Sequence, residues 1–195
     1  LERYNRHRYR AVTIRPNRTR PTPSAKPIKT EILRPQLEQL WQEILDRGRY
    51  VSAEELPDEL IDAFRVERVS LKRAEQYCHD ELADQELLEK AGADRREDLL
   101  VYFALEMFSG RQPYRQLQKS LQLDIREFFD SHANAQIEAR NLLFSTGDTD
   151  AIREACEAFA EEELGYISGG EQMLLHASTL DLLPPILRCY IGCAG

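Results

Sequence analysis

Residues 35–48 read PQLEQLWQEILDRG and contain the clearest structural signal in the chain. Their apolar residues recur at the i, i+3, i+4, i+7 and i+8 spacing of one helical face. These residues are Leu37, Leu40, Trp41, Ile44 and Leu45. Pro35 stands at the start of the pattern and Gly48 just past its end, the positions that these residue types favour in helices. The segment therefore predicts an amphipathic α-helix that buries one face.

The rest of the chain repeats this kind of pattern, and its 26 Leu against only 5 Val favour helices over strands. The helices that the apolar spacing predicts are a short turn after Pro57 with Leu60, Ile61 and Phe64, then 70–90, 94–110, 120–147 with or without a break near Ser131, 149–163, and a last helix from Ser178 or Thr179. Residues 172–176 are the one piece expected to be extended.

Capping residues mark where these helices should begin and end. The expected N-caps are Ser52 with Glu55, Asp94 with Glu97, Ser120, and either Thr149 or Asp150, and the expected stops are Gly92, Gly110 and Gly147. We therefore expect an all-α fold, an irregular multi-helix bundle or array that follows a basic, Pro-rich N-terminal arm.

The charges divide the chain into two parts. Residues 1–30 hold nine Arg and Lys against only Glu2, about +8, so the overall net charge of -8 leaves about -16 for the remainder. We therefore expect residues 1–33 to be a basic, Pro-rich arm or linker and residues 34–195 to be a helical domain. The chain opens with Leu1 and stops directly after the apolar run 191–194, which suggests a truncated piece of a longer protein.

The arm has two interpretations. Prolines recur along its second half and prevent a continuing helix, which is typical of a solvated interdomain linker. Its arginines, interleaved with Tyr4, His7 and Tyr9, are also suited to neutralising phosphates while the tyrosines stack on bases. The candidate nucleic-acid contacts are Arg3, Arg6, Arg8, Arg10, Arg15, Arg18 and Arg20.

Composition also bounds the class of protein. No run approaches the roughly 18 apolar residues of a membrane helix, and the N-terminus lacks the apolar segment of a signal peptide. The expected location is the cytoplasm, with no membrane partner. The four cysteines are too sparse for a disulfide framework, so reduced thiols are expected.

The sequence gives little support for catalysis by this chain. A glycine-rich strand-to-helix turn, a P-loop, HExxH and GxSxG are all absent, and Gly169 with Gly170 is expected to be a loop. Carboxylate pairs such as Glu97 with Asp98, and the run 161–163, are expected to form a solvated face. The loop 109–114 is expected to cap a helix through Arg111. We therefore predict no catalytic, cofactor-binding or metal-binding residue.

Neither the cysteines nor the histidines form a recognisable set of metal ligands. Cys189 and Cys193 could offer two thiolates to a metal, but no second ligand pair accompanies them, so buried core thiols are expected. His79 and His132 are expected to be solvated. His176 is expected to be structural, with a place facing a cleft as the alternative.

Four strings together resemble the C-terminal half of the bacterial DNA phosphorothioation-associated family of proposed methyltransferases. They are LLVYFALEMFSGR at 99–111, KSLQLDIREFF at 119–129, LLFSTGD at 142–148 and LPPILRCYIGCA at 183–194. The resemblance covers about residues 94–194. It implies a protein linked to sulfur modification of DNA, with methyl transfer from S-adenosylmethionine as the proposed activity.

In that family an S-adenosylmethionine-binding Rossmann domain precedes a connector and the helical region. The resemblance implies that residues 1–30 are the tail of the catalytic domain and the start of the connector. No catalytic or cofactor residue carries over, because the glycine-rich motif has no counterpart here. Gln118 stands where Pro is expected, and Ala177 follows His176 where Arg is expected, which weakens a phosphate-binding role for that segment.

Two functional hypotheses follow. The first is a helical accessory region, inactive alone, that positions DNA or proteins of the phosphorothioation system for a catalytic domain. The alternative is a non-catalytic helical adaptor that binds proteins, since an acidic body repels phosphate.

Overall fold

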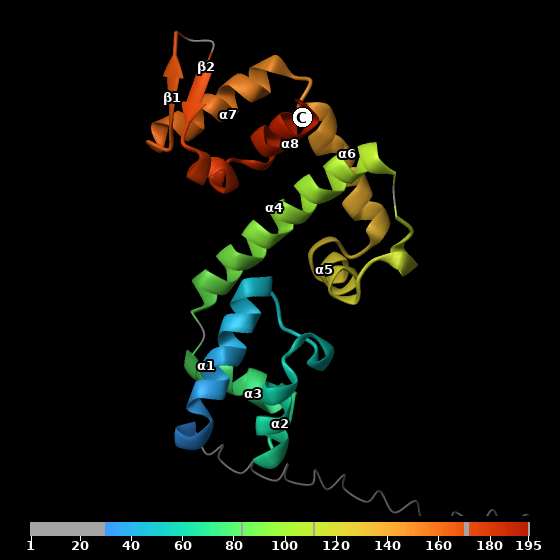
Figure 1. Ribbon diagram of the computed structural model, residues 1–195, viewed down its shortest axis with the longest axis vertical. Helices are drawn as coiled ribbons and strands as arrows, with labels where there is room; N and C mark the ends of the chain where they lie inside the picture. The colour runs from blue at the N-terminus through green and yellow to red at the C-terminus, as the bar shows by residue number, and fades with distance from the viewer. Residues whose placement is uncertain (1–29, 83, 111, 170–171, 195) are drawn as a thin grey trace, which may run out of the picture.

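The computed structural model describes residues 30–195 except 83, 111, 170–171 and 195, and this part of the chain is mostly helical (Figure 1). The α-helices are α1 (Thr30–Arg47), α2 (Asp58–Val66), α3 (Leu71–Tyr77), α4 (Gln85–Ser109), α5 (Lys119–Phe129), α6 (His132–Ser145), α7 (Thr149–Glu161) and α8 (Pro185–Ala194). Short helical turns are η1 (Ala53–Glu55), η2 (Cys78–Leu82), η3 (Tyr114–Gln116) and η4 (Ala177–Leu182), and one hairpin is formed by β1 (Gly165–Ser168) and β2 (Gln172–Leu175). The all-α prediction is confirmed for the described residues.

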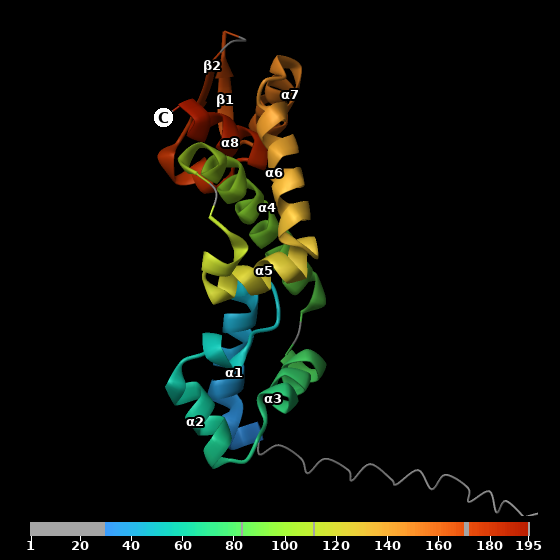
Figure 2. The same cartoon turned by 90° about the vertical axis from the view of Figure 1, so that its right-hand side faces the viewer.

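The long helix α4 is central to the arrangement (Figures 1 and 2). The helices α1, α2 and α3 gather at one end of the molecule, and α7, the hairpin and α8 gather at the other. None of the described helices combines the length and the apolar character needed to span a membrane.

The first core forms around α1. Leu37, Leu40 and Ile44 are fully buried there and pack with Phe64 of α2, which confirms the predicted amphipathic helix. The helix begins at Thr30, before Pro35, because Leu33 is buried in the same core and extends the apolar face by a further turn.

The prediction of one helix over 70–90 was wrong. The α-helix α3 ends at Tyr77 and passes into the π-helical turn η2. A new helix, α4, then begins at Gln85, where the Asp84 carboxylate accepts a hydrogen bond from the Leu87 backbone N–H at 3.2 Å. An N-cap of this kind satisfies a helical N–H that has no partner within the helix, so Asp84 is a natural start point.

Gly92 does not end a helix, contrary to prediction, but lies inside α4 against the end of α1. Gly48 has a φ of +62°, and a Cβ there would lie 2.5 Å from the carbonyl oxygen of Ala91. A Cβ on Gly92 would lie 3.0 Å from the carbonyl oxygen of Gly48. The two glycines therefore let the backbone at the end of α1 touch the backbone of α4. The predicted capping pair Asp94 and Glu97 was also wrong, because both residues lie within α4 and not at its start.

A second core joins α4, α5 and α6. The rings of Phe103 and Phe129 meet edge to face in it, with centroids 6.4 Å apart. The break left open near Ser131 is present, and the Ser131 side chain accepts a hydrogen bond from the Asn134 backbone N–H. The expected N-cap at Ser120 was wrong, because α5 begins at Lys119 and its N-cap is Gln118.

The start of α7 and the hairpin also differ from prediction. Asp148 caps α7, in place of Thr149 or Asp150, by accepting hydrogen bonds from two backbone N–H groups. The extended piece expected at 172–176 is confirmed as β2 up to Leu175. Its antiparallel partner β1 was not predicted, and the register pairs Gly165 with Leu175.

The last helix begins later than expected. Ser178 and Thr179 lie in the 3₁₀ turn η4, and α8 starts at Pro185. Proline is favoured in the first turn of a helix, where its missing N–H would have no partner. Phe159 of α7, Leu183 and Leu187 form a third small core beside the hairpin.

Candidate binding cleft

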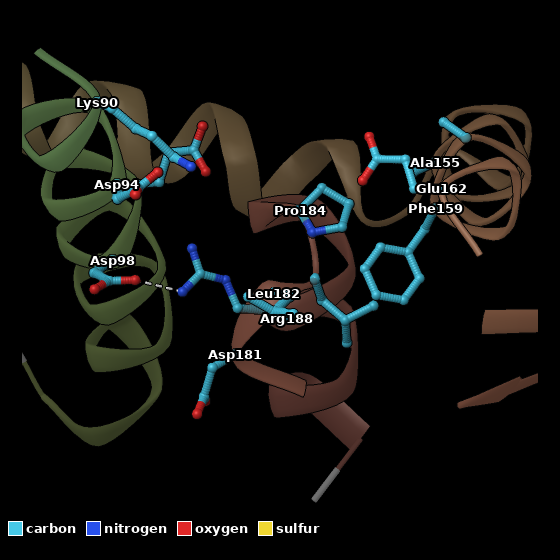
Figure 3. Close-up of a pocket in the computed structure, with 13 residues that line it drawn as sticks. Lys90, Asp94, Asp98, Ala155, Phe159, Glu162, Asp181, Leu182, Pro184 and Arg188 are labelled. Carbon is cyan, nitrogen blue, oxygen red and sulfur yellow. Dashed lines mark hydrogen bonds and ion pairs between the residues drawn. The ribbon is translucent and has the colours of Figure 1, made fainter. Parts of the chain in front are cut away.

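A cleft of about 580 Å³ lies between α4, α7, η4 and α8 (Figure 3). Phe159 and Leu183 form a buried apolar part of its wall, and Leu182 is exposed beside them. This volume lies within the usual range for pockets that hold small ligands or a few side chains.

Most of the other side chains that line the cleft are charged. The carboxylates are Asp94, Glu97, Asp98, Glu162 and Asp181, and the cations are Lys90 and Arg188. Five carboxylates against two cations leave an excess of three negative charges. The cleft therefore attracts positively charged groups.

Arg188 reaches from α8 across the cleft to Asp98 of α4 (Figure 3). Its Nη1 donates a hydrogen bond to Oδ1 of Asp98, and the Arg188 side chain is only 18 % exposed. Its Nε is buried and has no hydrogen-bond partner among the described residues.

A second polar cluster lies where α1 meets α4 and α5. The Arg49 guanidinium is buried there, and its Nε donates to Asp124 at 2.6 Å while Nη2 donates to Glu55 at 2.7 Å. Its remaining N–H groups bond Glu55 and the carbonyl oxygens of Tyr50 and Ser120. All five guanidinium donors are thus used.

Asp124 is held from two sides. Besides Arg49, Arg95 of α4 donates to its Oδ2 from Nη2 at 2.7 Å, and the Asp124 side chain is only 2 % exposed. The cluster ties the loop after α1 to α4 and α5. We call Arg49, Glu55, Arg95 and Asp124 the junction cluster.

Two members of the junction cluster, Glu55 and Arg49, have shifted pKa values. Burial by itself would raise the pKa of Glu55, but hydrogen bonds from Arg49 and from Ser52 outweigh it and lower that pKa to about 2. For Arg49, burial acts to lower the pKa, yet the bonds to Glu55 and Asp124 raise it overall. The Ser52 and Glu55 capping box predicted from sequence is confirmed, and it begins η1.

The residues predicted as functional lie in different places. The candidate nucleic-acid contacts Arg3, Arg6, Arg8, Arg10, Arg15, Arg18 and Arg20 all lie outside the described residues, as does Arg111 of the loop 109–114. The structure brings together Asp98 of the Glu97–Asp98 pair and Glu162 of the acidic run, which line the same cleft from α4 and from the end of α7. Both carboxylates are exposed, as expected, but they form part of a cleft rather than of a plain surface.

Two predictions for cysteine and histidine were wrong. Cys193 is exposed, whereas Cys189 is buried as expected, because only Cys189 faces the second core. His132 is half-buried, with its ring tilted against Tyr114 at 5.6 Å and edge to face with Phe103 at 6.1 Å. The short turn after Phe129 places His132 over the core, which periodicity could not show.

The other two histidines have local roles. His79 is exposed and shares a hydrogen bond with the Tyr50 hydroxyl at 3.1 Å. His176 is exposed, and its Nδ1 accepts a hydrogen bond from the Ser178 backbone N–H at the start of η4. Its structural role, the expected one, is confirmed.

Sequence reasoning missed Arg188 and the junction cluster. A signal was available for Asp124, which stands three residues after Leu121 and four before Phe128 on the apolar face of α5. A charge on such a face is usually buried with a partner. No signal could name Arg49 as that partner, because it lies 75 residues away in the sequence.

No family model, no curated protein and no solved structure matches this chain.

Proposed function

We propose that this chain is the helical accessory module of a DNA phosphorothioation-associated methyltransferase. In this proposal it acts in the cytoplasm and positions DNA or a partner protein for a catalytic domain that supplies S-adenosylmethionine binding and methyl transfer. The sequence of this chain has no glycine-rich cofactor turn, so we expect the isolated chain not to bind S-adenosylmethionine. Micromolar binding in a calorimetric titration would contradict that expectation.

The observation that carries the proposal is the way in which the four family-like strings pack. The second core contains Phe103 from the first string, Ile125 from the second and Cys189 from the fourth, and Leu142 from the third packs against it. Strings that are distant in sequence therefore share one packed unit. Such shared packing is what a resemblance to a whole folded region requires.

The proposal assigns DNA contact to the arm. The body beyond residue 30 carries about -16, which repels phosphates, whereas the first 30 residues carry about +8. Arginines without a recognition helix bind the DNA backbone, so we expect little sequence preference. If about half of the seven arginines engage at once, the log–log salt slope on duplex DNA should be near -3.

The test measures duplex affinity of the full chain as a function of salt. Replacing Arg6, Arg8 and Arg10 by Ala should weaken binding on every sequence and reduce the slope by up to about 3. The matched control removes the same charge from exposed body arginines that have no partner among the described residues, by Arg115→Ala, Arg126→Ala and Arg140→Ala. We expect the control to bind like the parent. Affinity that is independent of salt, or equal losses in both triple variants, would contradict the proposal.

A second candidate, an adaptor for protein partners, is favoured by one surface feature. Ile137 and Phe144 stand seven residues apart on the same face of α6 and are 54 % and 73 % exposed. If this face binds protein and the arm is only a linker, DNA affinity of the full chain should be absent. Measurable DNA binding that disappears with the arm arginines favours the first function over this one.

A further inference from the structure

The last helix, α8, brings two free thiols together at the edge of the second core. Cys189 and Cys193 stand four residues apart on it, the separation that places two side chains on one helical face. The two thiols share a hydrogen bond. Cys189 is buried in the second core and Cys193 is exposed. The pair therefore has one sulfur inside the core and one that solvent reaches.

The helical spacing suits a bridged pair of sulfurs better than a disulfide. Side chains four residues apart on a helix have Cβ atoms about 5–6 Å apart, whereas a disulfide needs about 3.5–4.5 Å between its Cβ atoms. A direct S–S bond would therefore deform the last turn of α8. Bonds from a metal ion to a thiolate are about 2.3 Å long, so a bridging ion lets the two sulfurs stay up to about 4.6 Å apart. That separation needs no change in the helix.

The number and kind of ligands select the ion. Zn²⁺ takes four ligands in a tetrahedral site, and α8 offers two sulfurs, since no group of three or more His, Cys, Asp or Glu side chains among the described residues could hold a metal ion. Ca²⁺ and Mg²⁺ require oxygen ligands. Cu(I) prefers soft thiolates and is satisfied by two of them in a nearly linear arrangement. The lack of a second ligand pair, which argues against zinc, is therefore no obstacle to Cu(I).

The surroundings of the pair are apolar on the side that faces α4. Cys189 belongs to the same core as Leu99 and Phe103. Gly192, which directly precedes Cys193, lies against α4 so closely that a Cβ there would be 2.7 Å from Cδ1 of Leu105. An apolar shell of this kind limits the access of water to a bound ion. An ion held by both sulfurs would thus be shielded on the core side and reachable from the side of Cys193.

We propose that Cys189 and Cys193 form a two-thiolate binding site for Cu(I). On binding, each thiol releases its proton to solvent and each sulfur supplies the electron pair of its bond to copper. One Cu(I) ion and two thiols thus give a singly negative complex and two protons, and no electron is transferred. This site does not depend on the proposed function, because it involves neither DNA nor S-adenosylmethionine.

The test measures Cu(I) binding to the full chain in its reduced form, without oxygen. Cu(I) is supplied as its complex with bicinchoninate, a coloured chelator whose absorbance falls as the protein withdraws the ion. The chain should withdraw one Cu(I) ion per molecule and release about two protons for each ion bound, since coordinating thiols are deprotonated. X-ray absorption at the copper edge should show two sulfur neighbours for each ion.

Three variants test the position of the two thiols. Cys193→Ser should weaken Cu(I) binding by more than about 100-fold, since even the loss of an outer-shell partner costs about 10–100-fold. The matched control, Cys156→Ser, changes a half-buried thiol on α7 and should bind like the parent. Cys193→Ser combined with Ile191→Cys keeps the number of thiols but places the pair two residues apart, where side chains do not face each other. This variant should bind as weakly as Cys193→Ser.

Other outcomes overturn the proposal. These are no withdrawal of Cu(I), equal binding by the parent and the Ile191→Cys variant, or sedimentation that shows two chains for each ion, which would mean that exposed Cys193 thiols of two copies hold it. Rapid formation of a disulfide between Cys189 and Cys193 in the folded chain would contradict the spacing argument. If Cys193→Ser fails to fold, as judged by circular dichroism, Cys193→Ala serves instead and must lose binding to the same extent.

Discussion

Loss of the buried cation at the centre of the junction cluster, Arg49, should lower the free energy of unfolding. Replacing Arg49 by Met keeps the apolar stem but leaves the Glu55 and Asp124 carboxylates, which are 5 % and 2 % exposed, without their shared partner. Removing one partner from a buried ion pair costs about 3–5 kcal/mol. Asp124 keeps its 2.7 Å bond from Arg95, whereas Glu55 keeps only a longer ion pair with Arg47, at 3.8 Å, so most of the loss should arise at Glu55.

The assay is urea unfolding at pH 7, followed by circular dichroism and by the fluorescence of Trp41, the only Trp in the chain. Arg49→Met should lower the free energy of unfolding by about 3–5 kcal/mol, and adding Glu55→Gln should restore about 1–3 kcal/mol by removing a buried charge that has lost its main partner. The control, Arg65→Met, breaks an exposed pair with Asp62 and should change stability by less than about 0.5 kcal/mol. A double variant less stable than the single Arg49 variant would refute this reasoning.

Three further predictions concern titration, packing and thiol reactivity. The pKa of Glu55 is lowered from 4.5 to about 2, so its ionised form contributes roughly 3 kcal/mol to the free energy of unfolding above pH 4.5, and this contribution is lost as the pH falls towards 2. Glu55→Gln should therefore make the free energy of unfolding depend less on pH between 4.5 and 2. An unchanged pH dependence would contradict this. Gly48→Ala should lower the thermal midpoint more than Gly110→Ala, since both have positive φ but only Gly48 lies against backbone; equal losses would mean that the contact with α4 is unimportant. A thiol reagent should modify exposed Cys193 in the folded protein and leave Cys189 unreacted, because burial and the neighbouring Cys193 raise the pKa of Cys189 to about 12. Simultaneous labelling of both thiols would contradict the burial of Cys189.

The fold class was predictable because apolar periodicity reports helices directly. Leu37, Leu40 and Ile44 show this, since their spacing alone predicted that they share one helical face, and the structure buries all three. Glycine was less informative. Gly92 has the sequence signature of a helix stop, yet its role is the contact with Gly48, a residue that is distant in sequence. Local pattern cannot distinguish the two uses.

The cleft was not predictable as a site. Asp98 and Arg188 stand 90 residues apart, and each looks like an ordinary surface charge in its own segment. The hairpin shows the same limit, because β1 is only four residues long and its burial depends on α7 and β2. Long-range pairing of this kind is set by tertiary packing, which periodicity does not contain.

The central claim, that this chain is the accessory module of a methyltransferase, is tested most directly by reading the genomic sequence immediately upstream of the codon for Leu1. The account predicts an open reading frame continuous with this chain that encodes a glycine-rich S-adenosylmethionine-binding motif. An intergenic region with a good start signal, and no such motif in frame, would contradict it.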